Sequence, residues 1–408
     1  TRIPDLFPQP KQFIVNLVLN HVKKMIPKYN LKNTIDFRDV VKDRGLKPKS
    51  VEIKNTDTAF LQYTGGTTGV SKGAVLTHRN VIANMEQMRG LMGDIIKEGE
   101  EIIITPLPMY HIFSLTVNCL AFICMGGKNV LITNPRDMPA FVKELQKHKW
   151  TVLTGVNTLF NGLLNNDDFK KLDFSSVKLV IGGAMAIQKV VAEKWRDVTG
   201  NLLVEGYGLT ESSPVASANP IDGRARIGTI GVPVASTDMK LIDENGKEVA
   251  VGERGEITIK GPQVMQGYYN RPEETANVLK DGWLRTGDVA VMAEDGFFTI
   301  VDRIKDMIIV SGFNVYPNEV EDVIASHPKV LEVAAIGVPD AKSTEAVKVF
   351  IVKNDPSLTE QEVRDYCEEN MTGYKKPKHI AFRDELPKTN VGKILRRALR
   401  EEEAAANA

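Results

Sequence analysis

The sequence has few cysteines and no excess of either charge. Its three cysteines, Cys119, Cys124 and Cys367, show no metal-ligand spacing and cannot all pair. We therefore expect free, buried thiols in a reducing compartment, the cytoplasm. Lysine and arginine together number 52, as do aspartate and glutamate. No net field therefore favours nucleic acid or an acidic membrane as a partner.

The sequence also lacks an uninterrupted apolar run. Its longest apolar region, LTVNCLAFICMGGKNVLI at 115–132, is broken by Asn118 and by the Gly-Gly-Lys triplet at 126–128. This predicts a helix that runs into a strand rather than a membrane span. No signal peptide pattern opens the chain. Its proline-rich start, without methionine, indicates a fragment boundary rather than a natural beginning.

What the sequence does contain is an ordinary globular composition. It is 42% hydrophobic and 25% charged over 408 residues, enough for two or three cores. Up to about Pro220, short apolar runs that end in or near glycine alternate with helical segments. The runs at 151–156, 177–183 and 201–208 are typical of buried parallel strands. This rhythm predicts a layered α/β domain.

Two segments show helical periodicity within that domain. Residues 77–92 place Val81, Met85, Met88 and Met92 on one face, so we expect these to be buried. We expect the opposite face to be solvated, with its polar residues outward: Asn84, Gln87 and Arg89. The segment 188–200 predicts a second helix, closed by Gly200.

The pattern of apolar and polar residues changes twice more along the chain. Residues 228–301 alternate as strands do, with turn signals between them, and predict a small β-rich subdomain. Residues 306–400 contain helix and strand patterns that suffice for a small α+β domain, including a capping box of Thr359 with Glu362. The polar tail at 401–408 is expected to fray.

Residues 63–73, YTGGTTGVSKG, combine four glycines with three threonines, one serine and Lys72. Glycines let the backbone approach a ligand, and successive N–H groups form an anion cradle. Hydroxyl groups and the lysine charge then suit a polyphosphate. The pattern is not G-x-x-x-x-G-K-[ST], because Lys72 follows Ser71 and precedes Gly73. A mobile surface loop would have a similar composition.

This loop resembles the phosphate loop of adenylate-forming enzymes, which include acyl-CoA synthetases, peptide-synthetase adenylation domains and firefly luciferase. Further motifs of that superfamily follow in the same order: YGLTESSP (207–214), GWLRTGD (282–288), VDRIKDMIIVSGFNVYPNEVE (301–321) and PKTNVGKILRR (387–397). Three other segments are similar to bacterial long-chain fatty-acid–CoA ligases: PMYHIFSLTVNCL (108–120), ITNPRDMPAFVKEL (132–145) and TGVNTLFNGLLNN (154–166).

The resemblance implies a large N-terminal α/β domain at 1–227 with a small β-subdomain, and a small mobile α+β C-terminal domain. It implies an acid–thiol ligase that uses ATP, Mg²⁺ and CoA. A fatty acid would be activated to acyl-AMP with release of pyrophosphate, then transferred to CoA. The alternatives are a CoA ligase for a medium-chain or aryl acid, and a catalytically dead nucleotide-binding homologue.

The resemblance also assigns the adenylation step. Lys393 matches the lysine that bridges the incoming carboxylate and the α-phosphate, a task suited to a point charge on a flexible stem; alone it would read as a solvated side chain. Glu211 matches the Mg²⁺ ligand, with Thr64 or Thr67 sharing the metal shell. The alternative, that Glu211 caps a helix, carries little weight beside the motif. Thr210 would donate to the α-phosphate.

Further positions match the nucleotide site. Tyr207 would stack on the adenine ring, and Asp288 would accept the ribose hydroxyls with Arg303 in support. His111 would gate the carboxylate site, although a lone histidine is more often a core residue. The remaining ATP contacts implied are Thr64, Gly65, Gly66, Thr67, Thr68, Gly69, Lys72, Gly183, Ala184, Glu205, Gly206 and Gly208.

The second half-reaction implies a moving domain. The segment 302–305 matches the hinge of the family, with Lys305 at the hinge position. A surface ion pair of Lys305 with Asp302 or Asp306 is compatible with that role. Rotation would withdraw Lys393 and bring Ser311, Gly312 and Phe313 to the pantetheine channel of CoA.

Three expectations concern the surroundings. The apolar residues Met109, Phe113, Val156 and Phe160 are expected to line the acyl pocket. Only 62 residues precede the phosphate loop, so we expect much of the N-terminal subdomain to be missing. A homodimer of the full-length protein and peripheral contact with the inner membrane also follow from the resemblance and from a fatty substrate.

Overall fold

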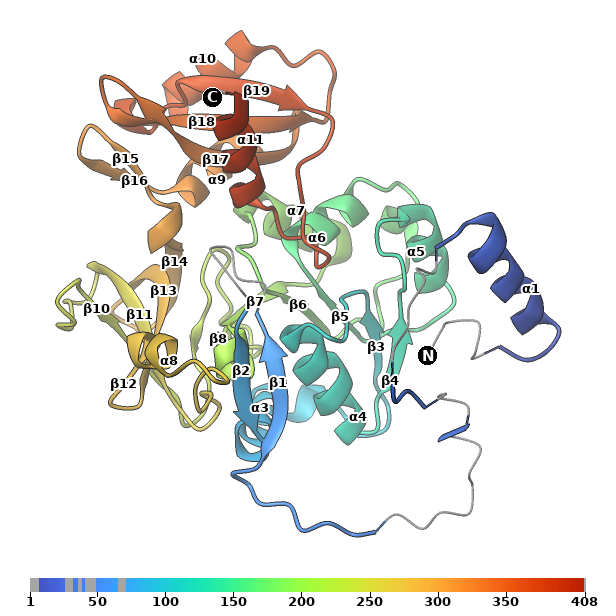
Figure 1. Ribbon diagram of the computed structural model, residues 1–408. Coiled ribbons are helices and arrows are strands. Elements are labelled where there is room, and N and C mark those ends of the chain that lie inside the picture. The colour runs from blue at the N-terminus through green and yellow to red at the C-terminus, as the bar shows by residue number, and fades with distance from the viewer. Residues whose placement is uncertain (1–6, 26–31, 36–38, 41–48, 65–70, 407–408) are drawn as a thin grey trace. The chain divides into compact units, whose positions relative to one another are not determined.

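The computed structural model describes residues 7–25, 32–35, 39–40, 49–64 and 71–406. It divides into two compact units, residues 1–53 and 54–408. In the first unit the helix α1 (Lys11–Leu17) continues into the π-helical segment η2 (Val18–Val22). The second unit carries the sheets formed by the described residues (Figure 1).

The largest sheet has seven strands in the order β4-β3-β5-β6-β7-β8-β9. The first five are parallel, whereas β8 and β9 are antiparallel. The predicted parallel strands are confirmed as β5, β6 and β7. The bounds are β3 (Ile102–Thr105), β4 (Lys128–Leu131), β5 (Val152–Gly155), β6 (Leu179–Gly182), β7 (Leu203–Gly208), β8 (Val215–Ala218) and β9 (Val232–Pro233).

Helical segments connect these strands and form the main core with them. Gly200 ends α7 in the left-handed conformation, as predicted. Ser114–Ala121 is π-helical and continues through a short helix to β4, which confirms the predicted helix running into a strand. The bounds are α3 (His78–Met92), η3 (Gly93–Ile95), η4 (Ser114–Ala121), α4 (Phe122–Cys124), α5 (Met138–Leu145), α6 (Asn157–Leu164), η5 (Phe169–Lys171) and α7 (Lys189–Thr199).

The outward polar face predicted for α3 is wrong in part. Asn84 and Gln87 are buried. The Asn84 side chain donates to the Val215 carbonyl at 2.8 Å and accepts from the Val215 N–H at 3.0 Å. Gln87 donates to the Ala235 carbonyl at 2.7 Å. These amides satisfy backbone groups of strand β8 and the following loop, so their burial leaves no unpaired polar group.

A five-stranded sheet follows, as the strand alternation predicted. Its strands are β10 (Asp238–Ile242), β11 (Arg254–Lys260), β12 (Leu279–Lys280), β13 (Trp283–Met292) and β14 (Phe298–Arg303). Pro272 begins the helix α8 (Pro272–Val278), where its missing N–H is not needed. A separate hairpin of β1 (Thr58–Tyr63) and β2 (Gly73–Thr77) flanks the glycine and threonine loop.

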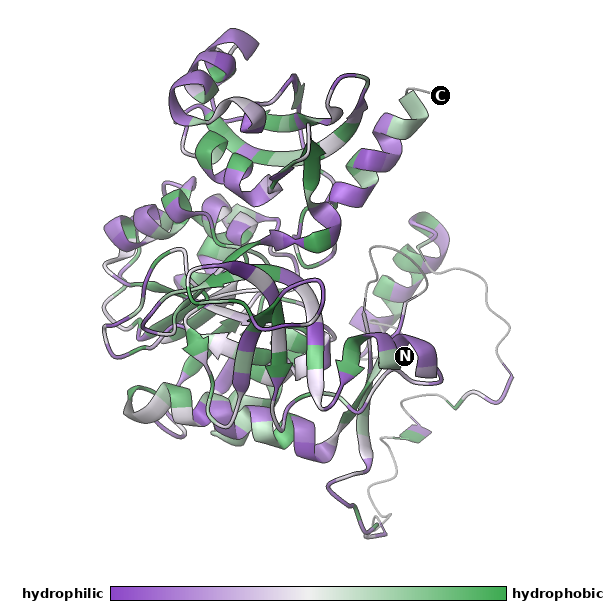
Figure 2. Ribbon diagram, turned by 90° about the vertical axis from the view of Figure 1, so that its left-hand side faces the viewer, coloured by the Kyte–Doolittle hydropathy of each residue, from purple (hydrophilic) through white to green (hydrophobic). Residues whose placement is uncertain are grey.

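The C-terminal part forms a third sheet with helices beside it. Figure 2 shows its apolar residues concentrated in the strands, which form two hydrophobic clusters with the helices. Thr359 caps α10 through the Glu362 N–H at 3.2 Å. The elements are β15 (Ile308–Val310), β16 (Phe313–Val315), α9 (Pro317–Ala325), β17 (Val330–Asp340), β18 (Thr344–Lys353), α10 (Glu360–Asn370), η8 (Gly373–Lys375), β19 (His379–Arg383) and α11 (Arg396–Ala406).

Two further expectations need correction. The polar tail is not frayed up to residue 406, because α11 continues to Ala406 and Glu403 pairs with Lys348 at 2.6 Å. The cysteines are free, but Cys124, the last residue of α4, is exposed, and only Cys367 among the three is buried. In the described part of the chain, no helix combines the length and apolarity needed to cross a bilayer.

Candidate active site

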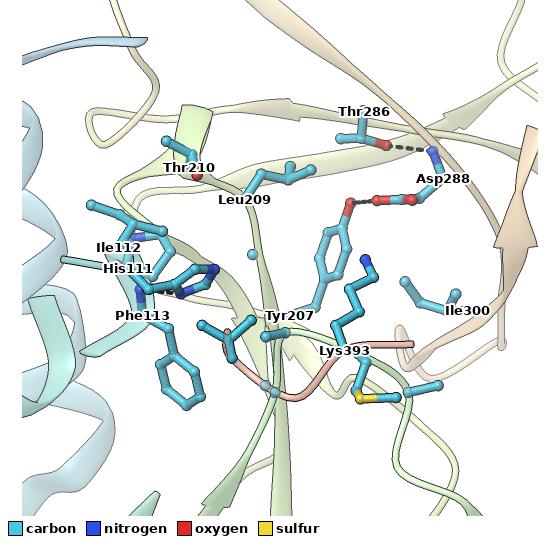
Figure 3. Close-up of a pocket in the computed structure, with 18 of the residues that line it drawn as sticks. His111, Ile112, Phe113, Tyr207, Leu209, Thr210, Thr286, Asp288, Ile300 and Lys393 are labelled. Atoms are coloured by element: carbon cyan, nitrogen blue, oxygen red, sulfur yellow. Dashed lines mark hydrogen bonds between the residues drawn. The ribbon is translucent and has the colours of Figure 1, made fainter. Parts of the chain in front are cut away.

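A cavity of about 1500 Å³ lies between the carboxyl ends of β6 and β7, strand β14 and the turn before α11 (Figure 3). The carboxyl edge of a parallel sheet is where α/β folds collect their binding residues. The predicted residues that line the cavity are Thr64, Lys72, His111, Gly183, Ala184, Glu205, Gly206, Tyr207, Gly208, Thr210, Glu211, Asp288, Arg303, Lys305 and Lys393.

Two predicted groups are not in this set. Gly65, Gly66, Thr67, Thr68 and Gly69 lie outside the described residues. Ser311, Gly312 and Phe313 are exposed at the tip of the β15–β16 hairpin and do not line the cavity. The Phe313 ring instead stacks on the Tyr374 ring, with centroids 4.7 Å apart.

Asp288 holds two predicted nucleotide residues together. The Tyr207 hydroxyl donates to its Oδ2 at 2.7 Å, and Arg303 Nε donates to its Oδ1 at 3.0 Å. Asp288 and Arg303 are direct partners in the β13–β14 ladder, so the sheet register places them side by side. Burial and then the Asp288 charge raise the pKa of Tyr207. Tyr207 therefore stays a neutral phenol with its hydroxyl fixed at Asp288.

Lys393 reaches this group from the C-terminal domain. Its side chain points into the cavity beside the Tyr207 ring (Figure 3). Burial lowers the pKa of Lys393 to about 7, and the Arg303 charge acts in the same direction against the attraction of Asp288. Arg396 and Lys305 lower it further. In the empty cavity Lys393 therefore loses its proton far more readily than an ordinary lysine, and a bound anion would favour its protonated form.

Glu211 is held by a residue that the sequence did not reveal. The Tyr268 hydroxyl donates to Glu211 Oε1 at 2.6 Å, and burial followed by the Glu211 charge raises the pKa of Tyr268. Lys72 Nζ lies 5.1 Å from the centre of the Tyr268 ring. Glu211 lies in the 3₁₀ turn η6 (Thr210–Ser212) and lines the cavity.

His111 and Glu205 are uncharged members of the wall. Burial, with Lys393 second, lowers the pKa of His111, so its ring is neutral at pH 7. Burial raises the pKa of Glu205 to about 8, against the bond that its carboxyl accepts from the Ile187 N–H at 3.2 Å. Glu205 thereby fixes the loop that contains Gly183, where an added Cβ would meet the Gly206 carbonyl at 3.2 Å.

One end of the cavity is apolar, but three of the four residues predicted for it are elsewhere. Phe113 lines the cavity, whereas Met109, Val156 and Phe160 do not. Phe160 packs inside the core against Trp195, with ring centroids 5.0 Å apart. The apolar lining comes instead from α3, η4, β6, β7 and a following loop: Met88, Leu91, Met92, Val117, Leu179, Val204 and Ile221.

Comparison with known sequences identifies relatives along the whole chain. The AMP-binding enzyme family matches residues 10–269, and the AMP-binding enzyme C-terminal domain matches residues 319–393. A long-chain-fatty-acid–CoA ligase of Yersinia pestis is 57% identical over 404 residues, which cover 99% of this chain and 72% of the relative. The long-chain-fatty-acid–CoA ligase of Haemophilus influenzae is 54% identical over 411 residues, covering 99% and 73%.

Solved structures give the same fold. The anthranilate CoA ligase AuaEII in complex with anthranoyl-AMP has a TM-score of 0.86 and 26% identity, over 97% of this chain and 78% of that chain. ATP-bound MatB from Rhodopseudomonas palustris has a TM-score of 0.78 and 31% identity, over 86% and 69%. The predicted fold, a large N-terminal α/β domain with a small C-terminal domain, is confirmed.

Proposed function

Since this chain belongs to the AMP-binding enzyme family, we propose that it is a long-chain fatty-acid–CoA ligase that forms AMP. The observation that carries the proposal is the cavity itself. Its lining joins Lys393, Asp288 and Glu211, which form the polar end, to apolar residues such as Met88, Val117 and Leu179, which form the apolar end, in a cavity of about 1500 Å³. The polar end suits a nucleotide and the apolar end suits a fatty acid.

The chemistry explains why a buried cation is needed. A carboxylate is a poor electrophile, because its charge repels nucleophiles and oxide is a poor leaving group. Its oxygen attacks the α-phosphorus of ATP, the bond to the β-phosphate oxygen breaks, and pyrophosphate leaves. Both reactants are anions, so their approach requires positive charge at the α-phosphate. Lys393 supplies that charge, and neutral His111 lines the carboxylate side without adding repulsion.

The other polar residues bind and orient the nucleotide. The Tyr207 ring provides a flat face for adenine, and Asp288 exchanges its present partners for the ribose hydroxyls. Thr210 donates to the α-phosphate. The Glu211 carboxylate and the Thr64 hydroxyl would hold Mg²⁺, which neutralises phosphate charge when bound. Their oxygen donors fit that ion, which takes few protein ligands beside phosphates.

The second half-reaction requires CoA to reach the acyl-adenylate. The thiolate attacks the acyl carbon, AMP leaves and a thioester forms. We assign the pantetheine contacts to Ser311, Gly312 and Phe313, which the hairpin tip exposes to solvent. Rotation about residues 302–305 would exchange this hairpin for Lys393. Lys305 lies in the 3₁₀ turn η7 (Ile304–Asp306), between β14 of the five-stranded β10–β14 sheet and β15 of the C-terminal sheet.

The domain boundaries at residues 227, 301 and 305 are part of this proposal, and so are a membrane contact and an oligomeric state. Long-chain acids partition into bilayers, so the proposal includes peripheral contact with the inner membrane. It also includes a homodimer of the full-length protein, which a sedimentation measurement would reveal.

Pyrophosphate exchange tests the function. We expect the full-length protein to incorporate labelled pyrophosphate into ATP only when a long-chain acid is present, and to release AMP rather than ADP. Acids from four to eighteen carbons and aryl acids should be compared. Exchange with short or aromatic acids alone would move the assignment to another acid, and exchange with none of them would favour a binding protein without catalysis.

A proton should accompany ATP binding. With a pKa of about 7, Lys393 is mostly neutral at pH 8 in the empty cavity. The phosphate charge favours the protonated form and raises that pKa. We therefore expect uptake of part of a proton when ATP binds at pH 8 without an acid. Calorimetric titration in buffers of different ionisation enthalpy measures this, and the uptake should vanish in Lys393→Met. Equal uptake in both proteins would refute the role of Lys393.

A further inference from the structure

Two polar side chains on one face of α6 contact the C-terminal domain. Thr158 and Asn161 are three residues apart and therefore share a helix face; both are half-buried. Thr158 Oγ1 donates to the Gly392 carbonyl at 3.0 Å, and Asn161 Nδ2 donates to the Leu331 carbonyl at 2.8 Å. Each bond joins the large α/β domain to the C-terminal sheet or to the turn that carries Lys393.

That turn is braced internally. The Thr389 N–H donates to the Lys393 carbonyl at 2.8 Å, and the Gly392 N–H donates to the Thr389 carbonyl at 3.0 Å. Lys388 Nζ pairs with both carboxylate oxygens of Glu332 at 2.7 Å. Glu332 follows Leu331 on β17. Asn161 therefore holds the strand segment to which the turn is itself tied, and α6 contributes to the placement of Lys393 together with the bond from Asn390 Nδ2 to the Tyr110 hydroxyl at 3.2 Å.

The contact between the turn and α6 is close. Gly392 has φ +83°, and a Cβ there would lie 3.0 Å from Thr158 Oγ1 and 3.3 Å from Val156 Cγ2. The start of α6 is anchored in turn to the cavity wall. The Asn157 side chain donates to the Gln188 side chain at 2.9 Å and accepts from the Gln188 N–H at 3.0 Å. A continuous set of bonds thus runs from the wall to the lysine.

We propose that Thr158 and Asn161 are positioning residues that hold the C-terminal domain in the orientation for adenylation and release it for thioester formation. The inference rests on the proposed function, because it requires Lys393 to serve one half-reaction and not the other. Bonds between neutral groups suit this task. Each shifts a conformational equilibrium by about fivefold, which biases the orientation without locking it.

Half-reactions measured separately test the proposal. In single turnovers of the full-length protein with palmitate, Thr158→Val and Asn161→Leu should each slow acyl-adenylate formation by about fivefold, and the double variant by more. Thioester formation from supplied palmitoyl-adenylate and CoA should be unchanged or faster. Thr158→Ser keeps the hydroxyl and should restore adenylation. Equal loss of both half-reactions, or no loss in the double variant, would overturn the proposal.

A matched control and a second readout separate this from folding and from the proposed function. Thr299→Val alters an exposed threonine on β14 and should change neither half-reaction. Spin labels at Lys194→Cys and Glu369→Cys, with Cys119 and Cys124 replaced by serine, report domain orientation without any chemistry. The double variant should broaden the distance distribution in the nucleotide-free protein. An unchanged distribution contradicts the positioning role, whereas a parent that lacks acid-dependent exchange contradicts the proposed function instead.

Discussion

Replacing Lys393 by alanine should abolish acyl-adenylate formation and leave thioester formation from supplied acyl-adenylate largely intact. The expected loss in the first half-reaction is about 10³-fold, the scale for removing a group that stabilises charge in a transition state. The second half-reaction is expected to survive because rotation withdraws Lys393 before CoA arrives. Single-turnover assays that start from the fatty acid and from the acyl-adenylate measure the two steps independently.

Lys393→Met is the matched variant, since it keeps a long unbranched side chain in the buried site. The folded protein should not lose stability in either variant. A pKa lowered to about 7 from an ordinary 10.5 means that the unfolded chain binds more protons between those values. Below pH 10 the burial of Lys393 therefore lowers the free energy of unfolding, and replacing the amine removes this cost. Unfolding by denaturant at pH 7 checks this. A similar fall in both half-reactions would contradict the role given to Lys393.

Sequence periodicity predicted the strands better than it predicted the faces of the helices. Strands β5 and β6 are buried along their whole length and β7 at its first two residues, so continuous apolar runs that end in or near glycine indicate them well. Asn84 and Gln87 were expected outside because their side chains are polar. Their partners are the carbonyls of Val215 and Ala235, more than a hundred residues away. A local sequence pattern cannot show that a backbone carbonyl so far along the chain needs a hydrogen-bond donor.

The polar end of the cavity could be predicted because its residues lie inside motifs with fixed spacing. Tyr268 lies outside them. Two backbone contacts bring it to Glu211: Tyr268 bridges Ala74 on β2, and the Met265 N–H donates to the Glu211 carbonyl at 2.8 Å. The apolar end was misjudged for another reason. Phe160 on α6 and Met88 on α3 are both apolar residues of the same buried core, and only packing decides that Met88 also lines the cavity whereas Phe160 does not. The type of a side chain predicts that it is buried, but not which residues or which cavity it packs against.

The hinge can be tested with a variant that keeps the conformation with Lys393 in the cavity and prevents rotation away from it. Lys305 lies in a 3₁₀ turn, where φ is about −50 to −70°, within the range that a proline ring imposes. The ring also disfavours the helical region for the preceding residue, Ile304, which begins the turn. Lys305→Pro should therefore remove the backbone freedom that rotation uses. The orientation in which the enzyme forms acyl-adenylate keeps the φ of residue 305 and should remain accessible, at a cost in stability at Ile304.

We expect Lys305→Pro to form acyl-adenylate at close to the parent rate and to make acyl-CoA at least about 10²-fold more slowly, the scale of loss when a reacting group is misplaced by about an ångström. Lys305→Ala removes the charge without restricting the backbone, so it separates these two effects of the proline substitution. Burial and the Arg303 charge lower the pKa of Lys305, so losing this cation relieves repulsion within the site. The alanine variant should therefore retain both half-reactions. A proline variant that makes acyl-CoA at the parent rate would place the hinge elsewhere in the chain, because a fixed φ at the true pivot cannot coexist with rotation.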